Sequence, residues 1–164
     1  MKGSYSLIIE TPEKAEIGAL GTKKFNQEYA VYNGSAFGPG GLKRVLRHFS
    51  SDKKIHWHID YLLKHGELKM AAVFPGKDLE CELSEKLDGR PVNGFGSSDC
   101  SCGSHLLEYR RLEEVFNDFN GFSGVKVLDR ERYKEYRKVE RDKPVEDLVR
   151  DLPGAEAYQR SRDI

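Results

Sequence analysis

The sequence has few cysteines, no long apolar run and no excess charge of either sign, and each absence excludes a class of protein. Its 164 residues include three cysteines, an odd and small number for the disulfide framework of a secreted domain. No stretch approaches the roughly 18 apolar residues of a membrane span. The 27 basic residues balance 27 acidic ones, which argues against a polycation that coats nucleic acid unselectively.

The N-terminus also lacks the features of a leader peptide. Met1 and Lys2 run almost directly into strand-forming residues, without an apolar h-region or a cleavage site. Together with the low cysteine count, this predicts a cytoplasmic protein with no membrane partner. The pattern does not indicate an oligomeric state.

Hydrophobic periodicity predicts the order of elements along the chain. Strand-forming runs occupy 5–10, 15–20, 28–32, 68–74 and 104–109, and helical spacing occupies 42–49, 59–66 and 79–87. Strands come first, and helices then surround a further strand. We therefore expect an α+β fold with a small, mainly antiparallel central sheet flanked by helices.

The composition changes after about residue 115. Residues 129–164 are dense in mixed charge and sparse in apolar residues, which favours exposed helices and a frayed tail over a second core. The prediction is a domain over residues 1–112 and a charged, mostly helical extension over 113–164.

A glycine-rich turn at 38–41 runs straight into a helix that opens with basic residues. Such a joint presents backbone N–H groups and guanidinium groups toward one place, which suits a phosphate. Arg44 and His48 are four residues apart and share one helix face. A cation beside a titratable imidazole points to phosphodiester chemistry.

Five segments in this order resemble the GIY-YIG endonuclease superfamily. They are Gly3-Ser4-Tyr5, Tyr32-Asn33-Gly34, the Arg44 to His48 stretch, Glu80-Cys81-Glu82-Leu83 and Asn93. Two longer stretches, Lys53 to Leu63 and Gly94 to Cys102, look closest to the Uri-type branch of archaea and bacteria. The resemblance covers roughly residues 1–110.

The resemblance implies a metal-dependent endonuclease that hydrolyses phosphodiester bonds in DNA, or in RNA. Tyr5 and Tyr32 would be the tyrosines of the two triplets, Arg44 would contact the scissile phosphate, and His48 would lie beside it. Glu80 would hold Mg²⁺ or Mn²⁺. A tyrosine serves as a base only if its pKa falls from about 10, and we expect Arg44, His48 and the metal to lower it.

The sequence departs from the superfamily pattern in ways that leave two assignments open. Ser4 and Asn33 stand where isoleucines are expected, which should weaken the packing of the sheet. Because the glycine-rich loop lengthens the step to the helix, Arg47 competes with Arg44 for the phosphate. Glu82 competes with Glu80 for the metal, and Asn93 is a weak match for the superfamily's late asparagine.

A second group of residues could bind the phosphate backbone of a nucleic acid. It comprises Arg47, Lys53, Lys54, His56 and His58. Trp57, which lies among them, could stack on a base. In the alternative interpretation Trp57 fills the core, and the two histidines cap the helix that starts near residue 58.

Cys100, Cys102 and His105 are candidate zinc ligands, and Cys81 could join them. Their spacing is atypical of a structural zinc site, and small buried cysteines in capped turns are the alternative. Two further functions therefore stay open beside the nuclease. One is a nucleic-acid-binding module without turnover, and the other is an interaction domain stabilised by zinc or thiols.

Overall fold

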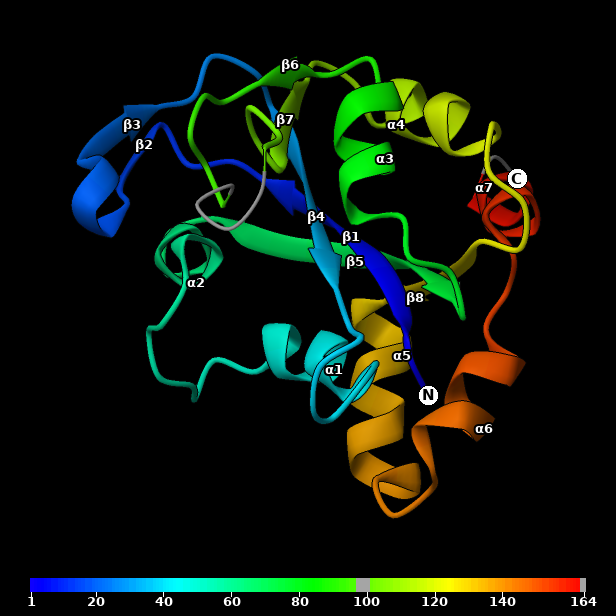
Figure 1. The fold of residues 1–164 in the computed structure, drawn as a ribbon. Helices are drawn as coiled ribbons and strands as arrows, with labels where there is room; N and C mark the ends of the chain where they lie inside the picture. Colours follow the sequence, from blue (N-terminus) through cyan, green and yellow to red (C-terminus); the bar gives the residue numbers. More distant parts are fainter. Residues whose placement is uncertain (97–100, 163–164) are drawn as a thin grey trace.

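A six-stranded antiparallel sheet lies at the centre of the computed structural model, which describes residues 1–96 and 101–162 (Figure 1). The strand order is β6 (Arg90–Pro91), β7 (Leu106–Tyr109), β4 (Tyr29–Ser35), β1 (Gly3–Glu10), β5 (Glu67–Pro75) and β8 (Lys126–Asp129). All neighbouring pairs are antiparallel. The predicted α+β fold with a mainly antiparallel sheet is confirmed.

The central strand β1 pairs with β4 on one side and with β5 on the other. Leu7 and Ile9 are buried against one layer of helices, whereas Ile8 is buried against the other. A strand covered on both faces has no solvent side to alternate with. This explains why residues 7–9 form a continuous apolar run.

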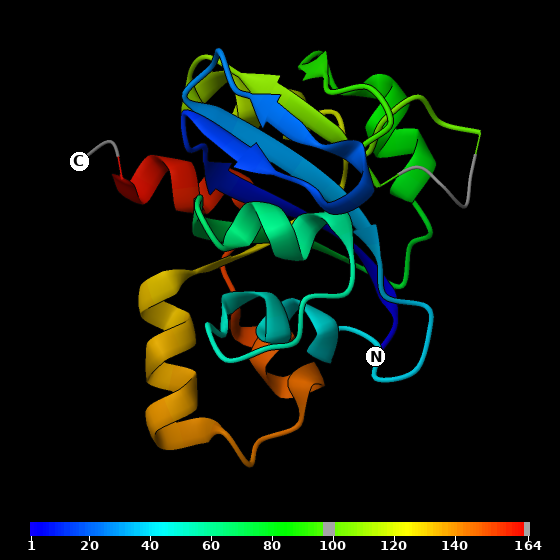
Figure 2. The ribbon, with the colours of Figure 1, turned by 90° about the vertical axis from the view of Figure 1, so that its left-hand side faces the viewer.

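Helices cover both faces of the sheet (Figures 1 and 2). One layer contains α1 (Lys43–Phe49), α2 (His58–Leu63), α5 (Arg130–Glu135) with the π-helical turn Tyr136–Glu140, and α6 (Val145–Asp151). The other layer contains α3 (Glu80–Lys86), α4 (Leu112–Phe119) and α7 (Ala155–Arg162). None of these described helices is long and apolar enough to cross a bilayer.

A small hairpin stands apart from the main sheet. Strand β2 (Lys14–Glu16) pairs with β3 (Thr22–Lys24), and a 3₁₀ turn at Gly18–Leu20 connects them. The sequence predicted one strand over 15–20, and that prediction is wrong beyond residue 16. Gly18 and Gly21 have φ of 46° and 74°, a left-handed conformation in which the chain reverses direction.

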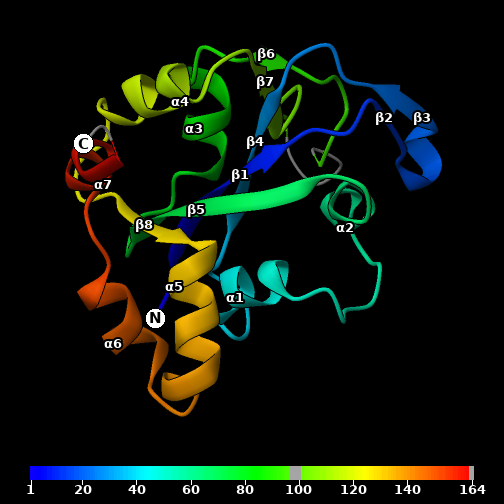
Figure 3. The same cartoon turned by 180° about the vertical axis from the view of Figure 1, so that it is seen from behind.

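The C-terminal segment is not the exposed extension that the sequence predicted. Strand β8 pairs with β5 at the edge of the main sheet, and α5 and α6 lie against the layer that contains α1 (Figure 3). The buried apolar side chains of this segment include Val127, Leu128, Tyr133, Tyr136, Val145, Leu148, Val149 and Leu152. Residues on both sides of position 112 therefore share one sheet and one core.

Candidate active site

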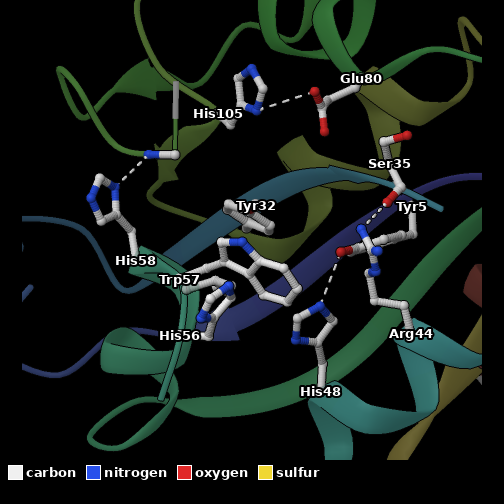
Figure 4. Close-up of a pocket in the computed structure, with 12 residues that line it drawn as sticks. Tyr5, Tyr32, Ser35, Arg44, His48, His56, Trp57, His58, Glu80 and His105 are labelled. Atoms are coloured by element: carbon white, nitrogen blue, oxygen red, sulfur yellow. Dashed lines mark hydrogen bonds and ion pairs between the residues drawn. The ribbon is translucent and has the colours of Figure 1, made fainter. Parts of the chain in front are cut away.

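A pocket of about 400 Å³ opens where the ends of β1 and β4 meet α1, α2 and α3 (Figure 4). Its walls are Tyr5, Tyr32, Ser35, Arg44, His48, His56, Trp57, His58, Ile59, Glu80, Gly96 and His105. All five residues predicted as catalytic lie together in this list, although they come from four different elements. The fold thus brings residues 75 positions apart in the sequence into one cavity.

Tyr5 enters the pocket from β1 across a glycine of the neighbouring strand. Tyr5 and Gly34 are partners in the β1–β4 register, and a Cβ atom at Gly34 would stand 2.6 Å from Tyr5 Cε2. The Tyr5 hydroxyl reaches His48 Nε2 on α1 at 3.0 Å. The glycine therefore gives the ring room to lie across the sheet toward α1.

His48 is a buried, neutral imidazole. Its side chain is almost fully enclosed, and this burial lowers the pKa of His48 to about 3, against a smaller opposing effect of Asp60. Nε2 faces Tyr5, whereas Nδ1 has no hydrogen-bond partner among the described residues. At neutral pH this histidine contributes no positive charge to the pocket.

Both pocket tyrosines have raised pKa values, contrary to the expectation from the sequence. Burial is the main cause for Tyr5 and for Tyr32, and the Glu80 carboxylate adds to it. Arg44 lowers the pKa of each phenol by a smaller amount. Arg44 acts in the expected direction, but the neutral His48 supplies no positive charge, and the desolvation of the phenols outweighs the effect of Arg44.

The two arginines of α1 have different surroundings. Arg44 lines the pocket, donates from Nη1 to the Ser35 carbonyl at 3.0 Å, and lies over the Trp57 ring at 5.3 Å. Arg47 instead pairs with the buried Asp60 carboxylate at 3.4 Å and donates to the Lys54 carbonyl. Arg44 is thus the arginine placed to meet a ligand in the pocket.

The two glutamates of α3 are also distinct. Glu80 begins the helix and lines the pocket, with a side chain that is 28% exposed. Its Oε1 lies 3.8 Å from His105 Nδ1. Glu82 forms an ion pair with Lys86 at 2.6 Å on the outer side of the helix. Neither Glu82 nor the exposed Asn93 is among the residues that line the cavity.

Ser4 and Asn33, which stand where the resemblance to the GIY-YIG superfamily led us to expect isoleucines, are buried and hydrogen-bonded. Ser4 donates to the Lys77 carbonyl and accepts from the Leu79 amide. Asn33 accepts from Ser6 and donates to Ser84 of α3. The expected loss of packing does not occur, because these side chains attach α3 and the segment before it to the sheet.

Trp57 lies on the rim of the pocket rather than in the core. Its side chain is 41% exposed, and the Arg44 and Arg47 guanidinium groups lie 5.3 and 5.2 Å from the ring centroid. Asp60, not a histidine, caps α2 by accepting from the His56 and Trp57 amides at 2.9 Å. The interpretation of Trp57 as a core residue is wrong.

The other predicted nucleic-acid contacts separate into two groups. His56 is exposed beside Trp57, and His58 accepts a hydrogen bond from the Gly96 amide at its Nδ1. Both histidines line the pocket, and Lys54 is exposed nearby. Lys53 instead donates to the carbonyls of His48 and Ser50, and burial lowers the pKa of its ammonium group. Its position is that of a cap on α1.

A family comparison adds to this geometry. Residues 4–124 match a family described as "Domain of unknown function DUF123". The chain belongs to the DUF123 family. No curated protein and no solved structure matches it. The DUF123 match runs from β1 through α4 and contains every residue that lines the pocket, whereas β8 and the helices after it lie outside the match.

A second cluster lies next to the pocket within the DUF123 match. Cys81 of α3, Cys102 and His105 place one ligand atom each within 4.8 Å of one another, and this cluster could hold a metal ion. Burial lowers the pKa of His105, which favours the neutral, metal-binding imidazole. Cys100, the fourth candidate zinc ligand, lies outside the described residues.

Sequence reasoning missed two contributions to the site. Ser35 supplies the carbonyl that orients Arg44, and Asp60 holds Arg47 and the start of α2. An Asp at the third position of a helix is a known N-terminal signal, so Asp60 was detectable. Ser35 acts through its backbone carbonyl, which every residue type has, so its role could not be detected from the sequence.

Proposed function

We propose that this protein is a metal-dependent nuclease that hydrolyses phosphodiester bonds in DNA, or in RNA. The observation that carries the proposal is the convergence of Tyr5, Tyr32, Arg44, His48 and Glu80 on one solvent-accessible pocket. The resemblance of the same residues to the GIY-YIG superfamily supports it. A phosphodiester substrate needs a cationic clamp, an activated water and charge compensation, and these residue types can supply all three.

Arg44 is the residue that would bind the scissile phosphate. A guanidinium has five N–H donors in a rigid fork, and the Ser35 carbonyl accepts from one of its terminal nitrogens. Trp57 lies against the same group. These two contacts would hold the fork in place while its remaining donors meet the phosphate oxygens, a geometry that favours bidentate binding.

Glu80 is the residue that would hold the divalent cation. It is the single carboxylate among the described residues that line the pocket, and its partial exposure leaves room for water. Mg²⁺ usually keeps several waters and binds through one or two carboxylates plus substrate phosphate. Such an ion would stabilise negative charge on the phosphate and lower the pKa of a bound water.

Tyr5 and His48 would move the proton. The Tyr5 hydroxyl can accept a proton from water while its own proton passes to Nε2 of the neutral His48, 3.0 Å away. The low pKa of His48 makes this costly before substrate binds. A bound phosphate brings negative charge close to the imidazole, which raises its pKa and lowers that cost. Tyr32 would donate to a phosphate oxygen.

A nucleic-acid-binding module without turnover is the second candidate. The raised pKa of Tyr5 and of Tyr32 favours it, because a phenol that holds its proton tightly is a poor base. Arg44, Trp57 and the rim histidines would then bind a strand that is not cut.

Cleavage and binding measured on the same variants separate the two candidates. Mixed single- and double-stranded DNA and RNA are incubated with Mg²⁺ or Mn²⁺, and binding is followed by anisotropy in chelator. A nuclease loses cleavage on Arg44→Ala and on Glu80→Ala, whereas Arg137→Ala and Glu85→Ala, which change exposed residues outside the pocket, keep it. Binding without cleavage under either metal would exclude the nuclease.

A further inference from the structure

The cluster of Cys81, Cys102 and His105 lies outside the proposed phosphate chemistry. Cys102 and His105 are buried, and Cys81 is half-buried in the first turn of α3. Their ligand atoms all lie within 4.8 Å of one another. Two thiols and an imidazole in such a group are the donors that zinc prefers, whereas Mg²⁺ and Mn²⁺ prefer oxygen.

The backbone that presents these ligands is held in place by its own hydrogen bonds. The His105 amide donates to the Phe95 carbonyl at 2.8 Å, and the His105 carbonyl accepts from the Asn33 amide at 2.9 Å. The Gly94 amide donates to the Gly103 carbonyl. The segment before β7, residues 101–105, is thus attached to β4. Cys81 comes from another element, the helix α3.

We infer that Cys81, Cys102 and His105 bind a zinc ion, which links the segment before β7, residues 101–105, to α3. Ligands on a tetrahedral zinc stand roughly 3.5–3.8 Å apart, given Zn–S near 2.3 Å and Zn–N near 2.0 Å. The observed separations are within reach of that geometry after small side-chain movements. Three protein donors leave the fourth position of the ion for another ligand.

The surroundings of His105 fit a metal-bound imidazole. Histidines that bind a metal usually donate their second ring N–H to a carboxylate, which fixes the tautomer and the ring orientation. The Glu80 carboxylate is placed to play that part: it lies 3.8 Å from His105 Nδ1, and this distance must shorten by less than about 1 Å for a hydrogen bond to form. The zinc site would therefore adjoin the oxygen-ligand site, with one histidine between two different metals. The inference depends only on the ligand geometry, so it holds whether or not the protein cuts nucleic acid.

Metal analysis of the full chain tests the inference. Protein purified under reducing conditions should contain one zinc per chain by elemental analysis, and Cys81→Ser and Cys102→Ser should each abolish that stoichiometry. His105→Ala should do the same, whereas His65→Ala, an exposed histidine away from the cluster, should retain the zinc. Stoichiometric iron or copper in place of zinc would overturn the assignment.

A second measurement keeps the test decisive if the cysteine variants do not fold. Wild-type protein is stripped with a chelator and titrated with Co²⁺, which should give the thiolate charge-transfer absorption of a cysteine-bound ion and be displaced by Zn²⁺. A wild-type chain with no zinc, no such absorption and an unchanged melting temperature after chelation would refute the site. So would a disulfide between Cys81 and Cys102 in mass spectra of unreduced protein.

Discussion

The Tyr5 ring crosses the sheet directly over Gly34, its partner in the β1–β4 register. This contact explains why a glycine follows Tyr32 and Asn33: any Cβ atom there would meet the phenol. The same contact fixes the direction in which the Tyr5 hydroxyl points, toward His48 on α1. A residue with no side chain thus sets the geometry of the pocket.

Gly34→Ala should displace the Tyr5 ring and break its hydrogen bond to His48. Overpacking of this kind costs about 1–3 kcal/mol, to be measured as a fall in the free energy of unfolding in urea. Cleavage or binding should fall as well, because the hydroxyl moves. Gly121→Ala is the control, since its new Cβ would meet no atom closer than 3.5 Å. Equal stability of the two variants would contradict this account of Gly34.

Replacing the two arginines of α1 should have different effects, one on cleavage and the other on stability. Arg44→Ala should reduce kcat/KM for cleavage by about 10²–10³, the usual cost of one donor to a transition-state charge, with little change in stability. Arg47→Ala leaves the buried Asp60 carboxylate without its cation, so stability should fall by about 1–3 kcal/mol. Urea unfolding and steady-state kinetics on both variants check this. The reverse pattern would assign the phosphate to Arg47.

The two glutamates of α3 provide a matched pair for the metal. Glu80→Gln should abolish Mg²⁺-dependent cleavage, because the pocket loses the carboxylate that would hold the ion. Glu82→Gln removes only an exposed ion pair with Lys86, which contributes less than about 1 kcal/mol, and should leave cleavage intact. Activity is measured across a Mg²⁺ titration. Activity of Glu80→Gln that is restored at high Mg²⁺ would indicate a weaker site, whereas wild-type behaviour would rule Glu80 out.

Trp57 is the only tryptophan in the chain, so intrinsic fluorescence reports on the pocket rim. A single-stranded oligonucleotide added in chelator should quench this fluorescence saturably as a base stacks on the ring. Trp57→Ala should weaken binding by about 1–3 kcal/mol, the usual contribution of one base stacked on an aromatic side chain, as measured by anisotropy. If Trp57→Ala bound the oligonucleotide with an unchanged dissociation constant, the bases would not stack on Trp57. Tyr61→Ala, in the helix α2 that begins just after Trp57 but outside the pocket lining, controls for general loss of packing.

His48 should make the protein less stable as the pH falls. Its folded pKa of about 3 lies below the unfolded value of about 6.5, so the unfolded chain takes up a proton that the folded one excludes. The contribution is fully present above pH 6.5 and decreases below it, by up to about 1.4 kcal/mol per pH unit. His48→Gln lacks this proton uptake, so the stability gap between wild type and variant should narrow from pH 7 to pH 4. A constant gap would show that His48 titrates normally.

The sequence predicted the parts of the fold in which a single pattern dominates. The apolar run of β1 and the spacing of Val45 and Phe49 in α1 identify a strand and a helix, because no other hydrophobic period occurs in these two segments. The catalytic candidates were found from residue order. Their convergence follows from β1 and β4 being adjacent antiparallel strands, which residue order alone does not prove.

The parts that were missed depend on long-range contacts. In α6, Val145, Leu148 and Val149 form a narrow apolar stripe that dense charge on the other faces conceals. The choice between Arg44 and Arg47 depends on Asp60, 13 positions beyond Arg47. The raised pKa of Tyr5 comes from burial, a property of the assembled pocket. None of these can be read from local residue type.

Strand β8 covers the edge that β5 would otherwise present. It pairs with Met70 to Val73 of β5, yet it begins at residue 126, just beyond the residues that match the DUF123 family. A fragment cut at residue 124 would free the backbone donors and acceptors of those β5 residues that bond to β8, which are alternate residues among Met70 to Val73. Exposed strand edges of this kind pair with other chains, so such a fragment would self-associate into aggregates even though it retained every side chain of the pocket.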